Sequence, residues 1–215
     1  MARILIFGGH GKVALLLAPL LAGRGDEVTS VIRNPAHADE VAATGAEPRV
    51  ADVETLDVDA LAQLVHGHDA IVWSAGAGGG NPARTYAVDR DAAIRSMDAA
   101  RAAGVDRYVM VSYLGSRPDH GVPRDEPFFA YAESKAAADE HLRASGLAHT
   151  ILQPGPLTLD EPTGLIETAE PGTGRVTRGD VAAVAAAVLA DDATAGRSIP
   201  FGNGATPIDE ALAAR

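Results

Sequence analysis

An apolar segment that runs directly into a cluster of glycines places the strongest constraint on how this 215-residue chain can fold. Residues 4–14 read ILIFGGHGKVA. The apolar part predicts a strand, the glycines predict a sharp turn, and the residues after them predict the first turn of a helix. Glycines at such a junction also let another group approach the backbone without meeting a Cβ atom.

The beginning of that helix is suited to an anion. Its first N–H groups lack partners within the helix and carry a partial positive charge. The spacing Gly8-x-x-Gly11-x-x-Ala14 is a variant of the dinucleotide fingerprint, with alanine in the close-packing position. An ordinary strand-to-helix turn is the alternative. The residues expected to hold the phosphates are Gly8, Gly9, His10, Gly11, Lys12 and Val13, although His10 and Lys12 are equally compatible with plain surface positions.

Strand-like and helix-like segments alternate along the rest of the chain. The expected strands are 3–7, 27–32, 47–50, 69–74, 107–112, 148–152 and 198–201. The expected helices are 12–22, 36–44, 57–65, 83–103, 128–145, 180–189 and 207–214. Segments 114–127 and 154–178 look irregular and are expected to form the substrate wall. This order predicts one α/β domain over residues 1–215, a Rossmann-type, doubly wound parallel sheet in a three-layer α/β/α arrangement.

Composition narrows the class of partner. The formal net charge is −11, which argues against nucleic acid or anionic lipid as the main partner. No run of 18 apolar residues occurs, there is no cysteine, and Met1 leads almost directly into the first expected strand. We therefore expect a cytoplasmic protein with a small-molecule substrate and no membrane partner, acting as a monomer or homodimer. His66-x-His68 lacks a third ligand at metal spacing, so no metal site is expected.

Ligands of parallel sheets bind beyond the carboxyl ends of the strands. Arg33 follows the second expected strand, where an acid would bind the ribose 2′-hydroxyl of NAD, whereas an arginine accommodates a 2′-phosphate. Arg33 therefore favours NADP(H) over NAD(H), with a solvated strand end as the alternative. Asp52 suits either the adenine amino group or a helix N-cap. The other residues expected at this edge are Val53, Ser74, Ala75, Gly76 and Pro154.

Tyr131 and Lys135 form a second constellation. Their spacing places both side chains on the same face of a helix. A lysine ammonium beside the phenol is expected to lower the pKa of Tyr131, so that the tyrosine acts as a general acid or base near neutral pH. The alternative is a solvated pair on an amphipathic helix.

The motifs together resemble a known superfamily. In chain order they are the turn 8–14, Arg33, Ala51-Asp52-Val53, the strand 108–112, Tyr131-x-x-x-Lys135, residues 153–156 and Thr177-Arg-Gly-Asp180-Val. The chain resembles the short-chain dehydrogenase/reductase superfamily, in its atypical NAD(P)H-binding branch of NmrA-like, biliverdin reductase B-type and sugar-epimerase-like proteins. The resemblance implies a cofactor across the strand ends, Tyr131 as the proton donor and Lys135 on the nicotinamide ribose.

Two positions depart from that pattern. The catalytic Ser/Thr of the superfamily often lies where this chain has Leu114, so Ser112 or Ser116 would have to serve, and Ser112 is our candidate. An asparagine often found in the helix after the fourth strand is replaced by Asp89. The expected function is an NADP(H)-dependent oxidoreductase that transfers hydride to a small carbonyl, quinone-like or conjugated acceptor. The alternatives are a non-catalytic NADP(H)-binding redox sensor and a nucleotide-sugar epimerase.

Overall fold

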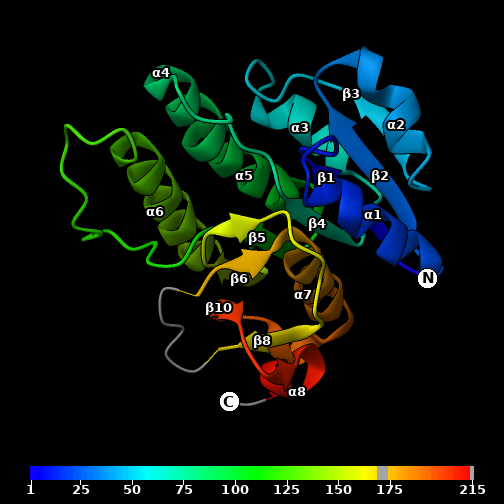
Figure 1. Ribbon diagram of the computed structural model, residues 1–215. Coiled ribbons are helices and arrows are strands. Elements are labelled where there is room, and N and C mark those ends of the chain that lie inside the picture. The colour runs from blue at the N-terminus through cyan, green and yellow to red at the C-terminus, as the bar shows by residue number, and fades with distance from the viewer. Residues whose placement is uncertain (169–173, 214–215) are drawn as a thin grey trace.

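A computed structural model of the protein describes residues 1–168 and 174–213 (Figure 1). The strands are β1 (Arg3–Phe7), β2 (Glu27–Ile32), β3 (Glu47–Val50), β4 (Ala70–Trp73), β5 (Arg107–Val111), β6 (Ala148–Pro154), β7 (Leu157–Thr158), β8 (Leu165–Glu167), β9 (Val176–Thr177), β10 (Arg197–Asn203) and β11 (Thr206–Pro207). The helices are α1 (Ala14–Gly23), α2 (Ala38–Ala42), α3 (Val58–Val65), α4 (Pro82–Thr85), α5 (Ala93–Ala103), α6 (Phe129–Ala144), α7 (Arg178–Ala190) and α8 (Ile208–Ala213). Tighter or wider turns occupy η1 (Pro35–His37), η2 (Tyr86–Ala92) and η3 (Asp192–Thr194).

The central sheet has the predicted doubly wound order. Its nine strands run β11-β8-β10-β6-β5-β4-β1-β2-β3. All neighbours from β10 to β3 pair in parallel. Helices α1 and α7 cover one face of this sheet, and α3, α5 and α6 cover the other (Figure 1). The Rossmann-type, three-layer α/β/α architecture is therefore confirmed.

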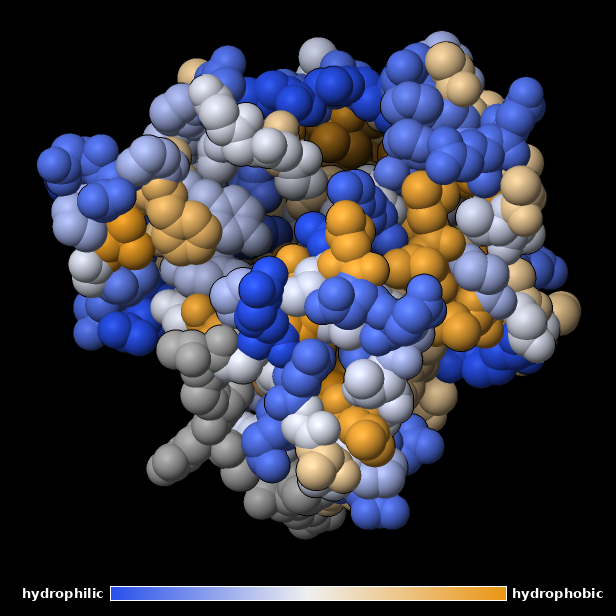
Figure 2. Space-filling model, viewed as in Figure 1, coloured by the Kyte–Doolittle hydropathy of each residue, from blue (hydrophilic) through white to orange (hydrophobic). Residues whose placement is uncertain are grey.

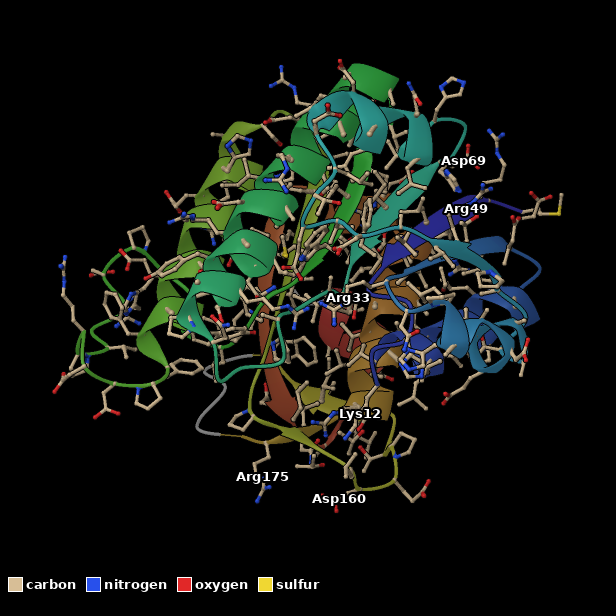
Figure 3. The ribbon with its side chains drawn as sticks, turned by 90° about the horizontal axis from the view of Figure 1, so that it is seen from above. Lys12, Arg33, Arg49, Asp69, Asp160 and Arg175 are labelled. Atoms are coloured by element: carbon tan, nitrogen blue, oxygen red, sulfur yellow. The ribbon has the colours of Figure 1, made fainter. Side chains whose placement is uncertain are left out.

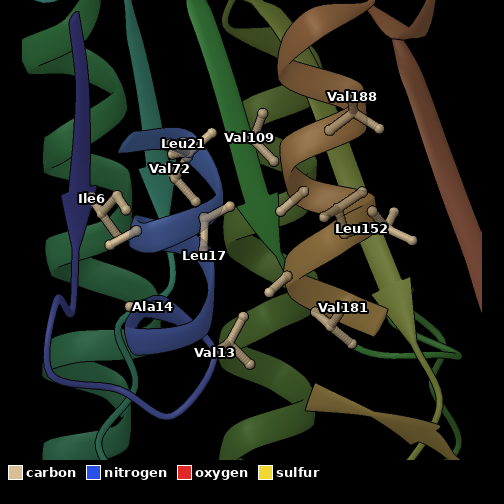
Figure 4. Packing of buried hydrophobic residues seen from close by; sticks show 14 of the residues in the cluster. Ile6, Val13, Ala14, Leu17, Leu21, Val72, Val109, Leu152, Val181 and Val188 are labelled. Carbon is tan, nitrogen blue, oxygen red and sulfur yellow. The ribbon is translucent and has the colours of Figure 1, made fainter. Parts of the chain in front are cut away.

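Two apolar clusters hold the layers together. On the α1–α7 side, Leu17 and Leu21 pack with Val181 and Val188 over the apolar face of the strands (Figure 4). On the opposite side, Trp73 lies in a second buried cluster with residues of α3, α5 and α6. Because both faces are covered, the central strands are apolar throughout rather than alternating, which is typical of parallel sheets.

The segment predicted to be irregular, 154–178, contains regular structure. It includes the short strands β7, β8 and β9. Strand β8 pairs antiparallel with β10 and β11. The prediction of a parallel sheet therefore fails at this edge. Strands of two or three residues are too short to show a periodic pattern, and for that reason sequence periodicity missed them.

The long helix predicted over 83–103 is divided. Helix α4 passes into the π-helical turn η2 before α5 begins. A π-helical turn inserts one extra residue per turn and frequently occurs at functional sites. Here it carries Asp89, whose side chain is 1% exposed. Among residues 1–168 and 174–213, no helix combines the length and apolar character needed to cross a membrane.

Asp180 at the first turn of α7 ties the C-terminal elements together. Its fully buried carboxylate accepts hydrogen bonds from the N–H groups of Thr163 (3.1 Å) and Gly164 (2.8 Å) and from the Thr177 hydroxyl (2.9 Å). The Asp180 N–H in turn donates to Thr177 Oγ1 at 2.9 Å. Thr177 is thus the N-cap of α7, and the Asp180 carboxylate holds both this cap and the loop that leads into β8.

We expect Asp180→Ala to lower the free energy of unfolding by about 3 kcal/mol, because the Thr163 and Gly164 N–H groups and the buried Thr177 hydroxyl lose their shared acceptor. Urea denaturation monitored by circular dichroism measures this change. The control is Asp59→Ala, which removes an exposed acid from the first turn of α3 and should cost less than about 0.5 kcal/mol. Equal effects of the two variants would contradict the role of Asp180 in holding the N-cap of α7 and the loop before β8.

Candidate functional site

The turn between β1 and α1 has no space for a side chain at Gly8, Gly9 or Gly11. Gly8 has a φ of +79°, and a Cβ atom built on it would lie 2.5 Å from Ala75 Cα. A Cβ atom on Gly9 would lie 2.5 Å from Ser30 Cβ, and one on Gly11 would lie 3.0 Å from the Gly8 carbonyl oxygen. The glycines therefore hold the turn against β2 and against the segment that follows β4. This bare backbone at the beginning of a helix fits the diphosphate of a dinucleotide.

A cavity of about 260 Å³ lies in front of the turn, where β1, β2, β3 and β4 end. Figure 2 shows this face of the molecule hollowed, with hydrophobic side chains in the depth and hydrophilic ones on the rim. Of the residues predicted for the cofactor, the cavity wall includes Gly8, His10, Gly11, Arg33, Asp52, Val53, Ser74, Ala75 and Gly76. The sheet topology thus brings together residues that are up to 68 positions apart in the sequence, from Gly8 to Gly76 (76 − 8).

Five of the predicted cofactor residues lie outside that wall. Lys12 has an exposed side chain at the front edge of the molecule (Figure 3). Val13 is buried in the core beneath the turn (Figure 4), and Gly9 packs against Ser30 of β2. Pro154, at the end of β6, lines a different cavity, and Lys135 lies deeper in the protein.

Arg33 belongs to a cluster of three charged side chains. Its Nη1 donates to Glu54 Oε1 at 3.1 Å, and Arg84 Nε donates to the same oxygen at 2.8 Å. Arg84 Nη1 also donates to the Ala77 carbonyl at 2.9 Å, which fixes the Arg84 side chain in the cavity wall. Figure 3 shows Arg33 near the centre of the molecule, as seen from above. Nothing in the local sequence predicted Glu54 or Arg84 here, because each comes from a different segment.

His10 and His37 meet at the rim of the same cavity. Their rings stack with centroids 3.6 Å apart, and His10 Nε2 lies 2.7 Å from Glu40 Oε2. Asp52 Oδ1 accepts the Glu54 N–H at 3.1 Å, whereas the N-cap of α3 is Asp57. Asp52 therefore shapes the loop after β3 and is not the helix cap that the sequence left open.

Tyr131 and Lys135 share one face of α6, as predicted, but their electrostatics differ from the prediction. Lys135 Nζ donates to the Val111 carbonyl at 2.9 Å and lies 3.9 Å from Asp89 Oδ1 and 5.9 Å from the centroid of the Tyr131 ring. Burial, followed by the nearby charges of Asp89 and Asp139, raises the pKa of Tyr131. The expected lowering of this pKa was wrong, because the ammonium of Lys135 faces the carboxylate and the backbone. Tyr131 therefore holds its proton at neutral pH.

Ser112 donates a hydrogen bond into the protein. Its hydroxyl and that of Ser116 both donate to Asp139 Oδ2 at 2.6 Å. Burial is the largest influence on Asp139 and raises the pKa of this carboxyl. Asp89 is also buried, which raises its pKa, and it accepts the Ala77 N–H at 2.9 Å. Asp139 was not among the predicted site residues, although its position one turn after Lys135 on α6 was the available signal.

A second, largely apolar cavity of about 450 Å³ begins where β5 and β6 end. Its wall consists of Ser112, Tyr113, Leu114, Phe128, Tyr131 and residues 154–157. Tyr131 also borders a third cavity of about 360 Å³ on the side of the glycine loop 78–80. Neither cavity has a charged side chain among these described residues. The Tyr131 phenol thus lies between two cavities without charged side chains, close to the carboxyl ends of β5 and β6.

Comparison with known proteins adds the family. A family model described as NAD(P)H-binding matches residues 8–192. The chain belongs to this NAD(P)H-binding family. Membership of this family shows a nicotinamide cofactor. The family includes oxidoreductases and epimerase-like proteins, which agrees with the resemblance drawn from the motifs.

Individual relatives cover nearly the whole chain. A curated protein of Bacillus subtilis named "Uncharacterized sugar epimerase YhfK" is 32% identical over 98% of both chains. A solved structure described as a putative NAD-dependent epimerase/dehydratase from Bacillus halodurans has a TM-score of 0.90 and 32% identity, over 99% of both chains. The oxidoreductase ylbE from Lactococcus lactis has a TM-score of 0.87 and 30% identity, over 98% of this chain and 94% of the other.

Proposed function

We propose that the protein is an NADP(H)-dependent oxidoreductase of the short-chain dehydrogenase/reductase type, acting on a small carbonyl, quinone-like or conjugated acceptor. The observation that carries this proposal is Tyr131, a phenol that keeps its proton on the wall of an apolar cavity. A proton donor in an uncharged recess suits the reduction of a neutral unsaturated group. The similarity to an oxidoreductase from Lactococcus lactis supports the same class.

The proposed roles follow from position. NADPH bound in the cofactor cavity would supply a hydride to the acceptor. The acceptor would gain this hydride and one proton, and NADP⁺ would remain in the cavity. The N–H groups of Gly9 and Gly11 donate to the Val31 and Gly8 carbonyls, so the remaining N–H groups of the turn 8–13 would bind the diphosphate. Asp52 and Val53 would border the adenine. Lys135 Nζ donates to the Val111 carbonyl and to Met110 Sδ, which leaves a third N–H for the nicotinamide ribose. Tyr131 gives its proton to the acceptor and regains one from solvent.

Arg33 is proposed to bind the 2′-phosphate. We expect Arg33→Gln to reduce the preference for NADPH over NADH by about 10- to 100-fold, because the 2′-phosphate loses a charge-assisted hydrogen bond. Fluorescence titration with each nucleotide measures it. The control is Arg49→Gln, which removes the same charge from an exposed position on the edge strand β3, away from the cavity (Figure 3). Equal affinities of the unaltered protein for NADPH and NADH would contradict the role of Arg33.

A redox sensor is the second candidate, and Ser112 is the observation that favours it. The Ser112 hydroxyl donates to Asp139 instead of into the cavity, and Leu114 takes the position where a catalytic Ser/Thr is often found. A screen of NADPH oxidation against aldehydes, quinones and flavins separates the candidates. Turnover with any acceptor supports the oxidoreductase, whereas tight NADPH binding without turnover supports the sensor. The names of the epimerase-like relatives make nucleotide sugars worth including in the screen.

A further inference from the structure

The apolar cavity beside Tyr131 has an aromatic wall. Tyr113, Phe128 and Tyr131 contact one another there, with ring centroids 5.2 to 5.5 Å apart. Phe128 is 45% exposed, so part of an aromatic ring stands free at the cavity rim. Aromatic faces of this kind stack on planar conjugated bodies. The described wall of this cavity offers no charged partner for a polar group.

A polar cavity adjoins the apolar one. The two have Leu157 in common, and the second, of about 510 Å³, is lined by Thr158, Leu159, Asp160, Arg175, Arg178 and Asn203. Figure 3 shows Arg175 and Asp160 at the same outer edge of the molecule. Thus a chain segment of two residues, β7, separates an aromatic recess from one that contains two guanidinium groups.

The two arginines have donors to spare. Arg178 Nη1 donates to the Thr158 carbonyl at 2.7 Å, which fixes this guanidinium over β7. In the part of the chain that the structure describes, no carboxylate forms an ion pair with Arg175 or Arg178. With Asp160 the described wall carries a formal charge of +2 − 1 = +1, in a chain of net charge −11. A guanidinium group matches the geometry of a carboxylate and binds it through two parallel hydrogen bonds.

We propose that the two cavities form one substrate site, which takes a planar conjugated acceptor that carries a carboxylate. The conjugated body lies against Tyr113, Phe128 and Tyr131, and the carboxylate reaches past Leu157 to Arg175 and Arg178. This inference rests on the proposed function for the reaction itself and adds the chemical class of the substrate. It also gives the site a direction, because the carboxylate points away from Tyr131 and leaves the unsaturated end beside the phenol.

Binding of matched acid and amide probes tests the inference without turnover. The protein, saturated with NADP⁺, is titrated calorimetrically with cinnamate and with the longer biphenylcarboxylate, and each acid is compared with its neutral carboxamide. At least one acid should bind about 10-fold or more tightly than its amide, the value of a charge-assisted bidentate contact. Arg175→Gln or Arg178→Gln should bring that ratio close to one, whereas Phe128→Ala should weaken acid and amide together.

Arg49→Gln is the control, since it removes the same charge far from both cavities. The inference is overturned if both acids bind no better than their amides, if the preference survives in both arginine variants, or if the control abolishes it as well. Because the titration reads binding alone, it is independent of the acceptor screen. A carboxylate preference without any NADPH turnover would remove the proposed oxidoreductase and retain the anion-binding half of the site.

Discussion

Tyr131→Phe should lower kcat for NADPH-dependent reduction by about 10²- to 10⁴-fold, the usual contribution of a positioned general acid. The variant keeps the ring that packs on Tyr113 and Phe128, so neither the fold nor the affinity for NADPH should change. Only the proton is lost. Steady-state kinetics with any acceptor found in the screen, together with an NADPH titration, measure both quantities.

Tyr113→Phe is the matched control, because this ring lines the same cavity and contacts Tyr131 with centroids 5.5 Å apart. Its effect on kcat should be small. The reverse pattern, in which Tyr113→Phe is inactive and Tyr131→Phe is active, would transfer the role of the acid to Tyr113.

The pH dependence of kcat gives a further expectation for the same residue. An ordinary tyrosine loses its proton near about pH 10. The pKa of Tyr131 is raised by burial, so its ionisation contributes no loss of activity below about pH 10. A decline in kcat caused by Tyr131 ionisation near neutral pH would mean that Lys135 lowers the pKa after all.

Gly8→Ala should abolish NADPH binding and destabilise the protein by about 2–5 kcal/mol. Two costs combine: a positive φ on a residue with a Cβ atom costs about 1–2 kcal/mol, and overpacking costs about 1–3 kcal/mol more. The second cost arises because the new methyl group would lie 2.5 Å from Ala75 Cα. Since Ala75 and Gly8 both line the cofactor cavity, the displacement also closes the approach of the diphosphate.

Gly25→Ala isolates the backbone cost. Gly25 has a φ of +90°, but a Cβ atom built on it meets no atom within 4 Å. This variant should lose about 1–2 kcal/mol and bind NADPH normally. Thermal unfolding and nucleotide titration of both variants give the comparison. Normal NADPH affinity in Gly8→Ala would show that the glycine turn is not the cofactor site.

The sequence predicted the parts of the fold that depend on local patterns. Strands 3–7, 27–32 and 47–50 have the predicted bounds. The first two are compact apolar or β-prone segments between turn residues, whereas 47–50 is a short, mostly exposed edge strand that directly follows the Gly45 turn. The π-helical turn that contains Asp89 was not predicted, since its residues continue the periodicity of the flanking helices. The antiparallel edge at β8 depends on pairing with a distant strand, which no local pattern reveals.

The same division applies to the site. The glycine turn and the residues at strand ends follow from chain order, because parallel strands all present their carboxyl ends at one edge. Glu54 and Arg84 come together through side-chain hydrogen bonds between separate loops, which sequence spacing does not encode. Helical spacing gave the shared face of Tyr131 and Lys135 correctly. It gave no information on where Lys135 Nζ points, and for that reason the direction of the Tyr131 pKa shift was wrong.

Deuterium transfer tests the central claim most directly. NADPH labelled with deuterium on the transferable position of its nicotinamide ring is incubated with the protein and an acceptor identified in the screen. The account predicts deuterium in the isolated product, detected by mass spectrometry, together with one NADP⁺ formed per product molecule. Tight binding of labelled NADPH with no deuterium in any acceptor, or an altered nucleotide sugar without net NADP⁺, would contradict it.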